Sequence, residues 1–368
     1  MDRMIRQRLA ELWVAPARSR RPYLVAELSG NHNGSLERAQ ALVTAAAAAG
    51  VDAIKLQTYT ADTITLDAPS DDFRVRKPGS AWEGRSLHSL YAEAALPWEW
   101  HRPLAEQALA LGLEWFSSPF DFSAVDFLES LDVPAYKIAS PEIVDLPLIR
   151  RCARTGKPLV ISTGMATVAE ISEAVAAARG EGCQRLVLLK CTTDYPAAAR
   201  DAQLRTIPHM AELFGCPAGL SDHTPGLGVA AAATALGAVL IEKHLTLRRA
   251  DGGPDAHFSL EPAEMTALVR ECHAAHEALG GVAYGPQECE RGYLRGRRSL
   301  YICADLRKGD RLTPHNLRSI RPGFGLPPKH YEAVLGRTVD RDLFRGTPLA
   351  WEFISQDRAA DAGDRPAS

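Results

Sequence analysis

The chain is 368 residues long, with 46% apolar and 24% charged residues, which is ordinary for a soluble globular protein and enough for one large domain and a small one. The formal net charge of −3 gives no reason to expect a nucleic-acid partner or an anionic membrane surface. The seven cysteines are scattered without a CxxC pair, and no apolar run resembles a signal peptide or a bilayer span, so we expect a reduced, cytoplasmic protein with no membrane partner.

Residues 1–20 are polar and Arg-rich, which predicts a flexible N-terminus. Residues 21–284 then alternate short apolar runs with amphipathic segments of helical length. The apolar runs, interpreted as strands, are 23–29, 51–58, 113–120, 135–140, 158–163, 185–192, 217–224 and 239–246. The helical segments include 36–49, 98–111, 167–179, 226–236 and 262–279. This α/β alternation predicts parallel strands with crossover helices, and eight such units match a (β/α)₈ TIM barrel.

An open, doubly wound sheet is the alternative fold for the same alternation. Against it, no GxGxxG motif follows the first strand. Polar residues also close nearly every strand instead of gathering at one switch point, which favours the barrel.

The connection formed by residues 59–97 is unusually long and contains prolines, glycines and tryptophans. A long loop after a barrel strand is usually functional, so we expect a lid or a wall of the substrate site. The alternative is an ordinary excursion that is packed by its own aromatic side chains.

The pattern changes after a predicted linker at 285–297. Residues 298–356 contain short strand-like runs and many turns, and the pattern D-L-x-x-G-x-x-L begins at Asp305 and again at Asp342. This repeat predicts a small β domain with pseudo-twofold symmetry. A domain of this size has a small hydrophobic core and would be only marginally stable by itself, so we expect it to dock on a barrel. Residues 357–368 are predicted to be a disordered tail.

Polar residues gather where the predicted strands end, which is the face of a barrel that carries the active site. They are Glu27 with Asn31, His32 and Asn33; Lys55 and Gln57; Ser117, Ser118 and Asp121; Lys137, Ser140 and Glu142; Ser162 and Thr163; Lys190, Thr192 and Tyr195; Ser221 and His223; and Glu242 and His244. Side chains two residues apart on a strand share a face, so His223 would lie on the face of Ser221, and His244 on that of Glu242. Some members of the set are expected to be buried hydrogen-bonded groups or solvated surface residues instead.

The residue types indicate chemistry on an anionic ligand. Lys55 and Lys137, with the nearby hydroxyls, suit a small ligand that carries phosphate and carboxylate groups. His223 and His244, on neighbouring strand ends, suit a divalent ion such as Mn²⁺ acting as a Lewis acid, although two unrelated histidines would produce the same spacing. Glu27 is a candidate general base or water-positioning group.

The ordered motifs resemble the sialic acid synthase family. They are AELSGNHNG (26–34), IKLQ (54–57), SSPFD (117–121), YKIASPE (136–142), STGM (162–165), CTTDYP (191–196), GLSDHT (219–224), EKHLT (242–246) and GGPD (252–255). The small C-terminal domain resembles the antifreeze-like (SAF, β-clip) domain of that family. Within the family, residues 86–101, 124–129, 258–262, 319–336 and 345–354 resemble the pseudaminic acid synthase branch.

The resemblance implies a transferase that condenses phosphoenolpyruvate with an N-acetylated amino sugar, for this branch 2,4-diacetamido-2,4,6-trideoxy-L-altrose, to give pseudaminate and phosphate. It implies a divalent metal on His223 and His244, expected to be Mn²⁺ with Mg²⁺ or Co²⁺ as alternatives, and Glu27 as a catalytic residue. Phosphoenolpyruvate would be held by Lys55, Ser118, Lys137, Ser140, Ser162, Thr193 and Ser221. The sugar would be held by Gln57, Glu142, Tyr195, Asp255 and Arg321, with Arg321 reaching the barrel of the other subunit in a domain-swapped homodimer.

Three other functions remain open at this stage. The same chemistry on another sugar would give N-acetylneuraminate or legionaminate, and Asp194 and His257, which depart from the family pattern, bear on that choice. A Schiff-base aldolase using Lys190 is a second class. A non-enzymatic binding protein, such as an ice-binding one, is a third.

Overall fold

The computed structural model of the protein describes residues 7–13 and 21–356. The rest of the predicted flexible N-terminus and the predicted tail, 357–368, lie outside the described residues. The described part divides into two compact units, with the division between Gly280 and Gly281. No helix in the described ranges is both long and apolar enough to cross a membrane.

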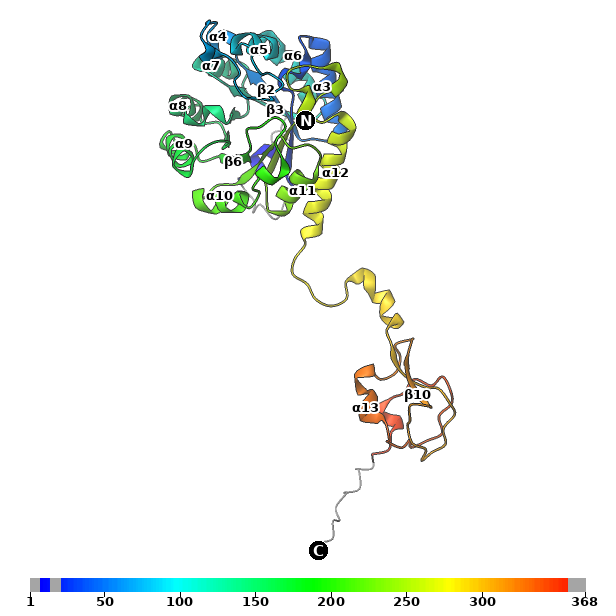
Figure 1. Cartoon of the computed structure of the whole chain (residues 1–368). Coiled ribbons are helices and arrows are strands. Elements are labelled where there is room, and N and C mark those ends of the chain that lie inside the picture. Colours follow the sequence, from blue (N-terminus) through cyan, green and yellow to red (C-terminus); the bar gives the residue numbers. More distant parts are fainter. Residues whose placement is uncertain (1–6, 14–20, 357–368) are drawn as a thin grey trace. The chain divides into compact units, whose positions relative to one another are not determined.

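The first unit is a closed barrel of eight parallel strands in the order of the sequence, and the predicted fold is confirmed (Figure 1). The strands are β1 (Tyr23–Glu27), β2 (Ala53–Thr58), β3 (Glu114–Pro119), β4 (Tyr136–Ile138), β5 (Leu159–Ser162), β6 (Leu186–Cys191), β7 (Ala218–Asp222) and β8 (Leu240–His244). The barrel closes where β1 pairs with β8, in a register that places Glu27 opposite His244. Glu27 is also opposite Lys55 on β2, so three polar side chains share one row at the carboxyl ends of the strands.

Helices surround the barrel and connect its strands (Figure 1). They are α3 (Leu36–Ala49), α4 (Ala61–Ile64), α5 (Leu87–Ala94), α6 (His101–Ala110), α7 (Phe122–Ser130), α8 (Leu146–Ala153), α9 (Val168–Gly180), α10 (Thr206–Phe214), α11 (Gly228–Ala235) and α12 (Pro262–Leu279). Short 3₁₀ turns lie between them: η2 (Ser29–His32), η3 (Asp71–Phe73), η4 (Trp98–Trp100), η5 (Pro141–Val144), η6 (Ala199–Asp201), η7 (Arg249–Asp251) and η8 (Ala256–Phe258).

Local sequence signals account for the helix ends. In α3 the Ser35 hydroxyl accepts a hydrogen bond from the Arg38 amide at 3.2 Å, and Gly50 ends the helix with φ +83°, a conformation that glycine adopts without strain. Leu42, Val43 and other buried residues at helical spacing turn one face of α3 toward the strands. The barrel and its helices therefore share one hydrophobic core.

The N-terminal segment is not wholly flexible, because residues Gln7–Glu11 form the short helix α2. The Leu9 side chain is buried, and its amide donates a hydrogen bond to Glu114 Oε2 at 3.1 Å. Glu114 is the first residue of β3, so α2 lies at the amino ends of the strands, opposite the polar strand ends. The prediction of flexibility failed here because Leu9 and Leu12 bury apolar surface against the barrel core.

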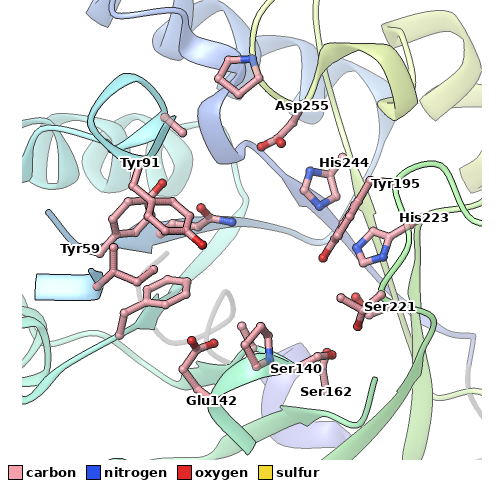
Figure 2. A pocket seen from close by; sticks show the side chains of 18 of the residues that line it. Tyr59, Tyr91, Ser140, Glu142, Ser162, Tyr195, Ser221, His223, His244 and Asp255 are labelled. Carbon is pink, nitrogen blue, oxygen red and sulfur yellow. The ribbon is translucent and has the colours of Figure 1, made fainter. Parts of the chain in front are cut away.

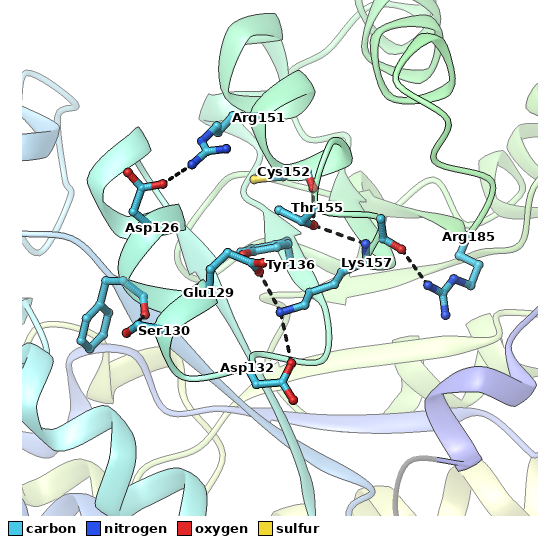
Figure 3. A network of polar contacts seen from close by, with 12 residues as sticks. Asp126, Glu129, Ser130, Asp132, Tyr136, Arg151, Cys152, Thr155, Lys157 and Arg185 are labelled. Atoms are coloured by element: carbon cyan, nitrogen blue, oxygen red, sulfur yellow. Dashed lines mark hydrogen bonds and ion pairs between the residues drawn. The ribbon is translucent and has the colours of Figure 1, made fainter.

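Polar contacts also join consecutive βα units on the outside of the barrel (Figure 3). Lys157 Nζ lies 2.7 Å from Glu129 Oε1, and the Tyr136 hydroxyl donates to the same carboxylate oxygen at 2.5 Å. Arg151 pairs with Asp126 nearby. Because these pairs are partly exposed, each is expected to contribute about 0–1 kcal/mol to stability.

The second unit has its own hydrophobic core, which includes Leu300, Leu317 and Leu349. Its elements are η9 (Glu288–Gly296), β9 (Ser299–Ile302), β10 (Leu317–Ile320), η10 (Pro328–His330), α13 (Tyr331–Val334) and η11 (Trp351–Phe353). Strands β9 and β10 are antiparallel. The helix η9 lies within the stretch predicted as a linker.

The repeated motif of the second unit is symmetric in the structure. Leu306 and Leu343 face each other in an antiparallel bridge and exchange backbone hydrogen bonds of 2.8 and 2.9 Å. Asp305 Oδ1 accepts from the Arg345 amide, and Asp342 Oδ1 accepts from the Lys308 amide, both at 2.8 Å. The two copies thus cap each other, as the predicted pseudo-twofold arrangement requires.

Candidate active site

A cavity of about 500 Å³ opens at the carboxyl ends of the barrel strands (Figure 2). Most of the residues predicted to form the site line it: Lys55, Gln57, Lys137, Ser140, Glu142, Ser162, Thr193, Tyr195, Ser221, His223, His244 and Asp255. They come from strands and loops far apart in sequence, and the barrel brings them together.

Three predicted residues do not line this cavity. Glu27 lies behind Lys55, with 2.5 Å between Glu27 Oε2 and Lys55 Nζ. Ser118 accepts a hydrogen bond from the same ammonium group at 3.3 Å. Arg321 belongs to the second unit, where it lines a hollow with Arg297 and Arg298, so its contact with a barrel stays a prediction.

A buried network of charges forms the floor of the cavity. Glu242 Oε1 lies 3.6 Å from Lys137 Nζ and 3.8 Å from Lys55 Nζ, and it accepts a hydrogen bond from the Ser221 hydroxyl at 3.2 Å. Both lysines are almost completely buried. The two ammonium groups can bind an anion, because Glu27, with its pKa raised to about 7 by burial, does not fully offset their charge near neutral pH.

The network sets the protonation of its members. Burial raises the pKa of Glu27 to about 7, against the opposing effect of Lys55. Burial would also raise the pKa of Glu242, but Lys137 and Lys55 together hold it below its ordinary value. Burial lowers the pKa of Lys137, whereas Glu242 and Glu27 outweigh burial at Lys55 and raise its pKa. Glu27 is therefore the carboxyl group poised to exchange a proton near neutral pH.

Hydroxyl groups without partners lie on one side of the cavity. Among the described residues, the buried Ser162 Oγ and Thr193 Oγ1 find no hydrogen-bond partner. Gly164 keeps this corner open, because a Cβ at Gly164 would lie 2.2 Å from Thr193 Oγ1 and 2.7 Å from Ser140 Oγ. Buried polar atoms are seldom left unsatisfied, so this corner fits a ligand with several oxygen acceptors, such as a phosphate group.

The two histidines lie together, with ring centroids 5.4 Å apart. His223 Nδ1 is 2.9 Å from the Thr192 carbonyl oxygen, and His244 Nδ1 is 3.1 Å from Ser29 Oγ. These contacts leave both Nε2 atoms available, and burial keeps the pKa of His244 well below its ordinary value, so that its imidazole is neutral. The pair fits a divalent ion as two nitrogen ligands.

The remaining ligands of such an ion would come from substrate or water. Across the described ranges, no group of three or more His, Cys, Asp or Glu side chains is arranged to hold a metal by itself. A site that keeps several positions open is typical of a catalytic metal and not of a structural one.

The opposite side of the cavity is formed by residues that the sequence did not single out. Figure 2 shows Tyr59 and Tyr91 across the cavity from His223 and His244. Their neighbours on this side are apolar: Ile64, Val75, Leu87, Leu90, Ala94 and Phe120. All but Phe120 belong to the long connection that was predicted to be a lid or a substrate wall, and they do line the cavity.

The long connection also contacts the loops after β6 and β8. Trp82 Nε1 donates to the Pro254 carbonyl at 2.9 Å, and its ring lies 5.7 Å from that of Tyr195 and 5.8 Å from that of His257. Lys77 pairs with Asp194. Asp194 and His257, which were less expected from the family pattern, therefore both contact this segment.

Comparison with known proteins identifies the family. The NeuB family model matches residues 42–284, and the SAF domain model matches residues 297–355. The chain belongs to the NeuB family. The predicted resemblance is thereby confirmed, for the barrel and for the small domain.

Individual relatives cover most of the chain. A pseudaminic acid synthase from Helicobacter pylori is 40% identical over 337 residues, which is 91% of this chain and 98% of that protein. An N,N'-diacetyllegionaminic acid synthase from Legionella pneumophila is 37% identical over 339 residues, covering 90% and 94%. The crystal structure of an N-acetylneuraminic acid synthetase from Leptospira borgpetersenii has a TM-score of 0.65 at 29% identity, covering 76% of this chain and 92% of that one.

The geometry removes one alternative for this NeuB family member. Lys190 was weighed as an imine-forming lysine, but its neighbour on the strand, Cys191, lines the cavity, and Lys190 does not. Successive side chains of a strand point to opposite faces, and Lys190 Nζ instead donates to the Cys191 carbonyl at 2.8 Å. A Schiff-base mechanism on Lys190 is therefore wrong for this pocket.

Glu242 is a polar residue of the cavity for which the sequence predicted no role. It was placed among the strand-end residues but received no role, although it contacts both lysines of the floor. The signal was present, because Glu242 is two residues before His244 and opposite Ser221 on β7.

Proposed function

We propose that this protein condenses phosphoenolpyruvate with 2,4-diacetamido-2,4,6-trideoxy-L-altrose to give pseudaminate and phosphate. One observation carries the proposal: two buried lysines and a corner of unpartnered hydroxyls lie beside a pair of histidines in one cavity. A ligand with a phosphate, a carboxylate and a reacting carbonyl nearby matches this arrangement. The identity to pseudaminic acid synthases over nine-tenths of the chain supports the same substrate pair.

Phosphoenolpyruvate binds at the floor of the cavity in this proposal. Lys55 and Lys137 offset its negative charges, and the Ser221 hydroxyl donates to Glu242, which lies near both lysines. The free Ser162 and Thr193 hydroxyls, with Ser140, donate to the phosphate oxygens. Ser118 acts behind them, by holding the Lys55 ammonium group.

His223 and His244 would hold the divalent ion, which we propose to be Mn²⁺, with Mg²⁺ or Co²⁺ able to substitute. When bound, the ion would supply Lewis-acid polarisation of the sugar aldehyde oxygen. The Thr192 carbonyl and the Ser29 hydroxyl fix the two imidazole rings through their Nδ1 atoms. These contacts orient both imidazole rings before an ion binds.

The bonds change in two stages. C3 of phosphoenolpyruvate forms a bond to the aldehyde carbon of the open-chain sugar, and the aldehyde oxygen takes up a proton. Water then adds at C2 and gives up one proton, the C2–O bond to phosphate breaks, and the second proton of the water leaves with inorganic phosphate as the C2 hydroxyl becomes the keto group. Glu27, which is paired with Lys55 behind the cavity floor and has a pKa of about 7, receives a proton from the Lys55 ammonium group, and Lys55 in turn takes the proton that the water gives up.

The sugar is placed between the metal ligands and the loop side of the cavity. Gln57, Glu142, Tyr195 and Asp255 line this part, and Glu142 Oε2 is a buried acceptor without a partner among the described residues. We also propose a domain-swapped homodimer in which Arg321 of one subunit reaches the sugar in the other. The exposed position of Arg321 on a separate compact unit supports that arrangement.

The test is turnover with phosphoenolpyruvate on three sugars: the altrose derivative, the corresponding precursor of legionaminate, and N-acetylmannosamine. The proposal predicts the highest kcat/KM for the altrose derivative. A higher value for the legionaminate precursor would replace it with the second candidate, which the 37% identity to a legionaminic acid synthase favours next.

A further inference from the structure

The loop side of the cavity is lined by five apolar side chains, those of Ile64, Val75, Leu87, Leu90 and Phe120, which we name the apolar wall. Four of its members come from α4, α5 and the chain between them, and α4 packs against α5. The Val75 amide donates to the Arg85 carbonyl at 2.9 Å, which ties Val75 to the start of α5. The apolar wall is therefore a built surface of the protein.

The apolar wall is flanked by polar groups that face the same cavity. Tyr59 and Tyr91 carry hydroxyls on one side, and Glu142 lies on another (Figure 2). These groups suit the oxygen and nitrogen atoms of acylamino substituents. The apolar wall itself has no side-chain hydrogen-bonding atom, so an alkyl group of the ligand gains by burial there, whereas a hydroxyl loses its water without replacement.

Contacts across the mouth of the cavity hold this segment in place. Trp82 donates to Pro254 and packs against Tyr195 and His257, and Lys77 pairs with Asp194. Leu87 and its neighbours on the apolar wall are at most partly exposed, so a hydroxyl held against them loses part of its water shell without gaining a partner there.

We propose that the apolar wall makes the enzyme selective for 6-deoxy sugars, by accepting a terminal methyl group and rejecting a terminal hydroxymethyl group. The inference rests on the proposed function for the orientation of the sugar, with its aldehyde at the histidines and its far end at the wall. It assigns specificity to residues of the long connection and not to the strand ends.

The test compares kcat/KM for two sugars that differ at C6 alone: 2,4-diacetamido-2,4,6-trideoxy-altrose and the analogue that keeps the 6-hydroxyl. We expect the wild-type enzyme to favour the 6-deoxy sugar by about 10- to 100-fold. Leu87→Gln offers the hydroxyl a partner and should reduce that ratio by about tenfold, with KM for phosphoenolpyruvate unchanged. Leu66→Gln is the matched control, because Leu66 is on the same segment but 61% exposed, and it should leave the ratio unchanged.

Equal kcat/KM for the two sugars in the wild-type enzyme, or equal shifts from Leu87→Gln and Leu66→Gln, would overturn the inference. If Leu87→Gln does not unfold cooperatively, Val75→Thr, which keeps the side-chain volume, replaces it with the same expected direction. If the enzyme prefers a sugar other than the altrose derivative, the proposed function is contradicted but this inference is not. The C6 pair is then measured in the preferred series, where a 6-deoxy preference supports the apolar wall and its absence contradicts it.

Discussion

The two sides of the cavity are built in different ways. On one side, the barrel register sets the positions of the side chains: Glu27 is opposite both Lys55 and His244. On the other side, a long connection folds over the cavity and is held by Trp82 and by the pair of Lys77 with Asp194. We therefore expect the barrel side to govern catalysis and the long connection to govern the choice of sugar.

The strand side should show the largest loss of activity when one of its groups is removed. His244→Ala deletes one of the two imidazole ligands and should lower kcat/KM by about 10³-fold. The variant should also lose the stabilisation by Mn²⁺ that a thermal melt detects in the wild-type protein. His209→Ala, at an exposed position on α10, is the control and should change neither quantity. Activity of His244→Ala within a fewfold of wild type would remove the histidine pair from the mechanism.

Substitution of two buried lysines, Lys55 and Lys243, should affect activity and stability to different extents. Lys55→Met should lower kcat/KM by about 10²- to 10³-fold, and its cost in unfolding free energy should be smaller than that of Lys243→Met, because the stranded Glu27, with a pKa of about 7, can take up a proton. Lys243, on the outer face of β8, donates to Asp222 Oδ2 at 2.6 Å, and Lys243→Met should cost about 3–5 kcal/mol of unfolding free energy because it leaves the Asp222 carboxylate buried without its partner. Denaturant unfolding and steady-state kinetics on both variants measure the difference. Reversed effects would show that the two lysines have been assigned the wrong roles.

The pH dependence of kcat/KM tests whether Glu27 is the proton acceptor, with another buried carboxyl group as the control. Because burial raises its pKa to about 7, the proton-accepting carboxylate disappears as pH falls through about 7, and kcat/KM should fall with it. Glu27→Gln should lack this limb.

Glu114 is the control, since burial also raises its pKa to about 7, but at the opposite end of the barrel. The folded state holds the Glu114 proton more tightly than the unfolded state does. Its contribution to the free energy of unfolding is therefore largest at low pH and declines as pH rises from 4.5 to about 7. Glu114→Gln should remove that decline and keep the activity limb, and loss of the activity limb in Glu114→Gln would contradict the assignment to Glu27.

The connection should show a smaller effect that is specific for the sugar. Trp82→Ala removes the hydrogen bond to Pro254 and the ring contacts, so KM for the sugar should rise by about tenfold with little change for phosphoenolpyruvate. Trp82→Phe keeps much of the packing and should lie between wild type and Trp82→Ala. An equal rise in both KM values would mean that Trp82 supports the whole cavity and not the sugar side.

Much of the strand side was predictable from sequence. Parallel barrel strands place their carboxyl ends on one face, so polar residues that close apolar runs, such as Lys55, Lys137 and His244, are expected to converge. Strand alternation could also have excluded Lys190, which precedes the cavity-lining Cys191. Its position two residues before His244 places Glu242 on the cavity face, but its contacts with the two lysines depend on the packing of three strands and could not be predicted from sequence.

The loop side was not predictable from sequence beyond the expectation that a long connection is functional. Ile64, Val75 and Leu87 show no periodicity that assigns them to a face, because they lie in short helices and irregular chain. Their positions depend on contacts across the cavity, such as that of Trp82 with Tyr195, which no local pattern encodes. The order of α2 was missed for the same reason, since Leu9 and Leu12 are buried by the barrel core.

The most direct test of the account is a product assay with phosphoenolpyruvate and 2,4-diacetamido-2,4,6-trideoxy-L-altrose, before and after thorough chelation and again after Mn²⁺ is restored. We predict one phosphate released for each molecule of pseudaminate formed, loss of both products on chelation, and recovery of both with Mn²⁺. Full turnover after chelation, or phosphate release without formation of the sugar acid, would contradict it.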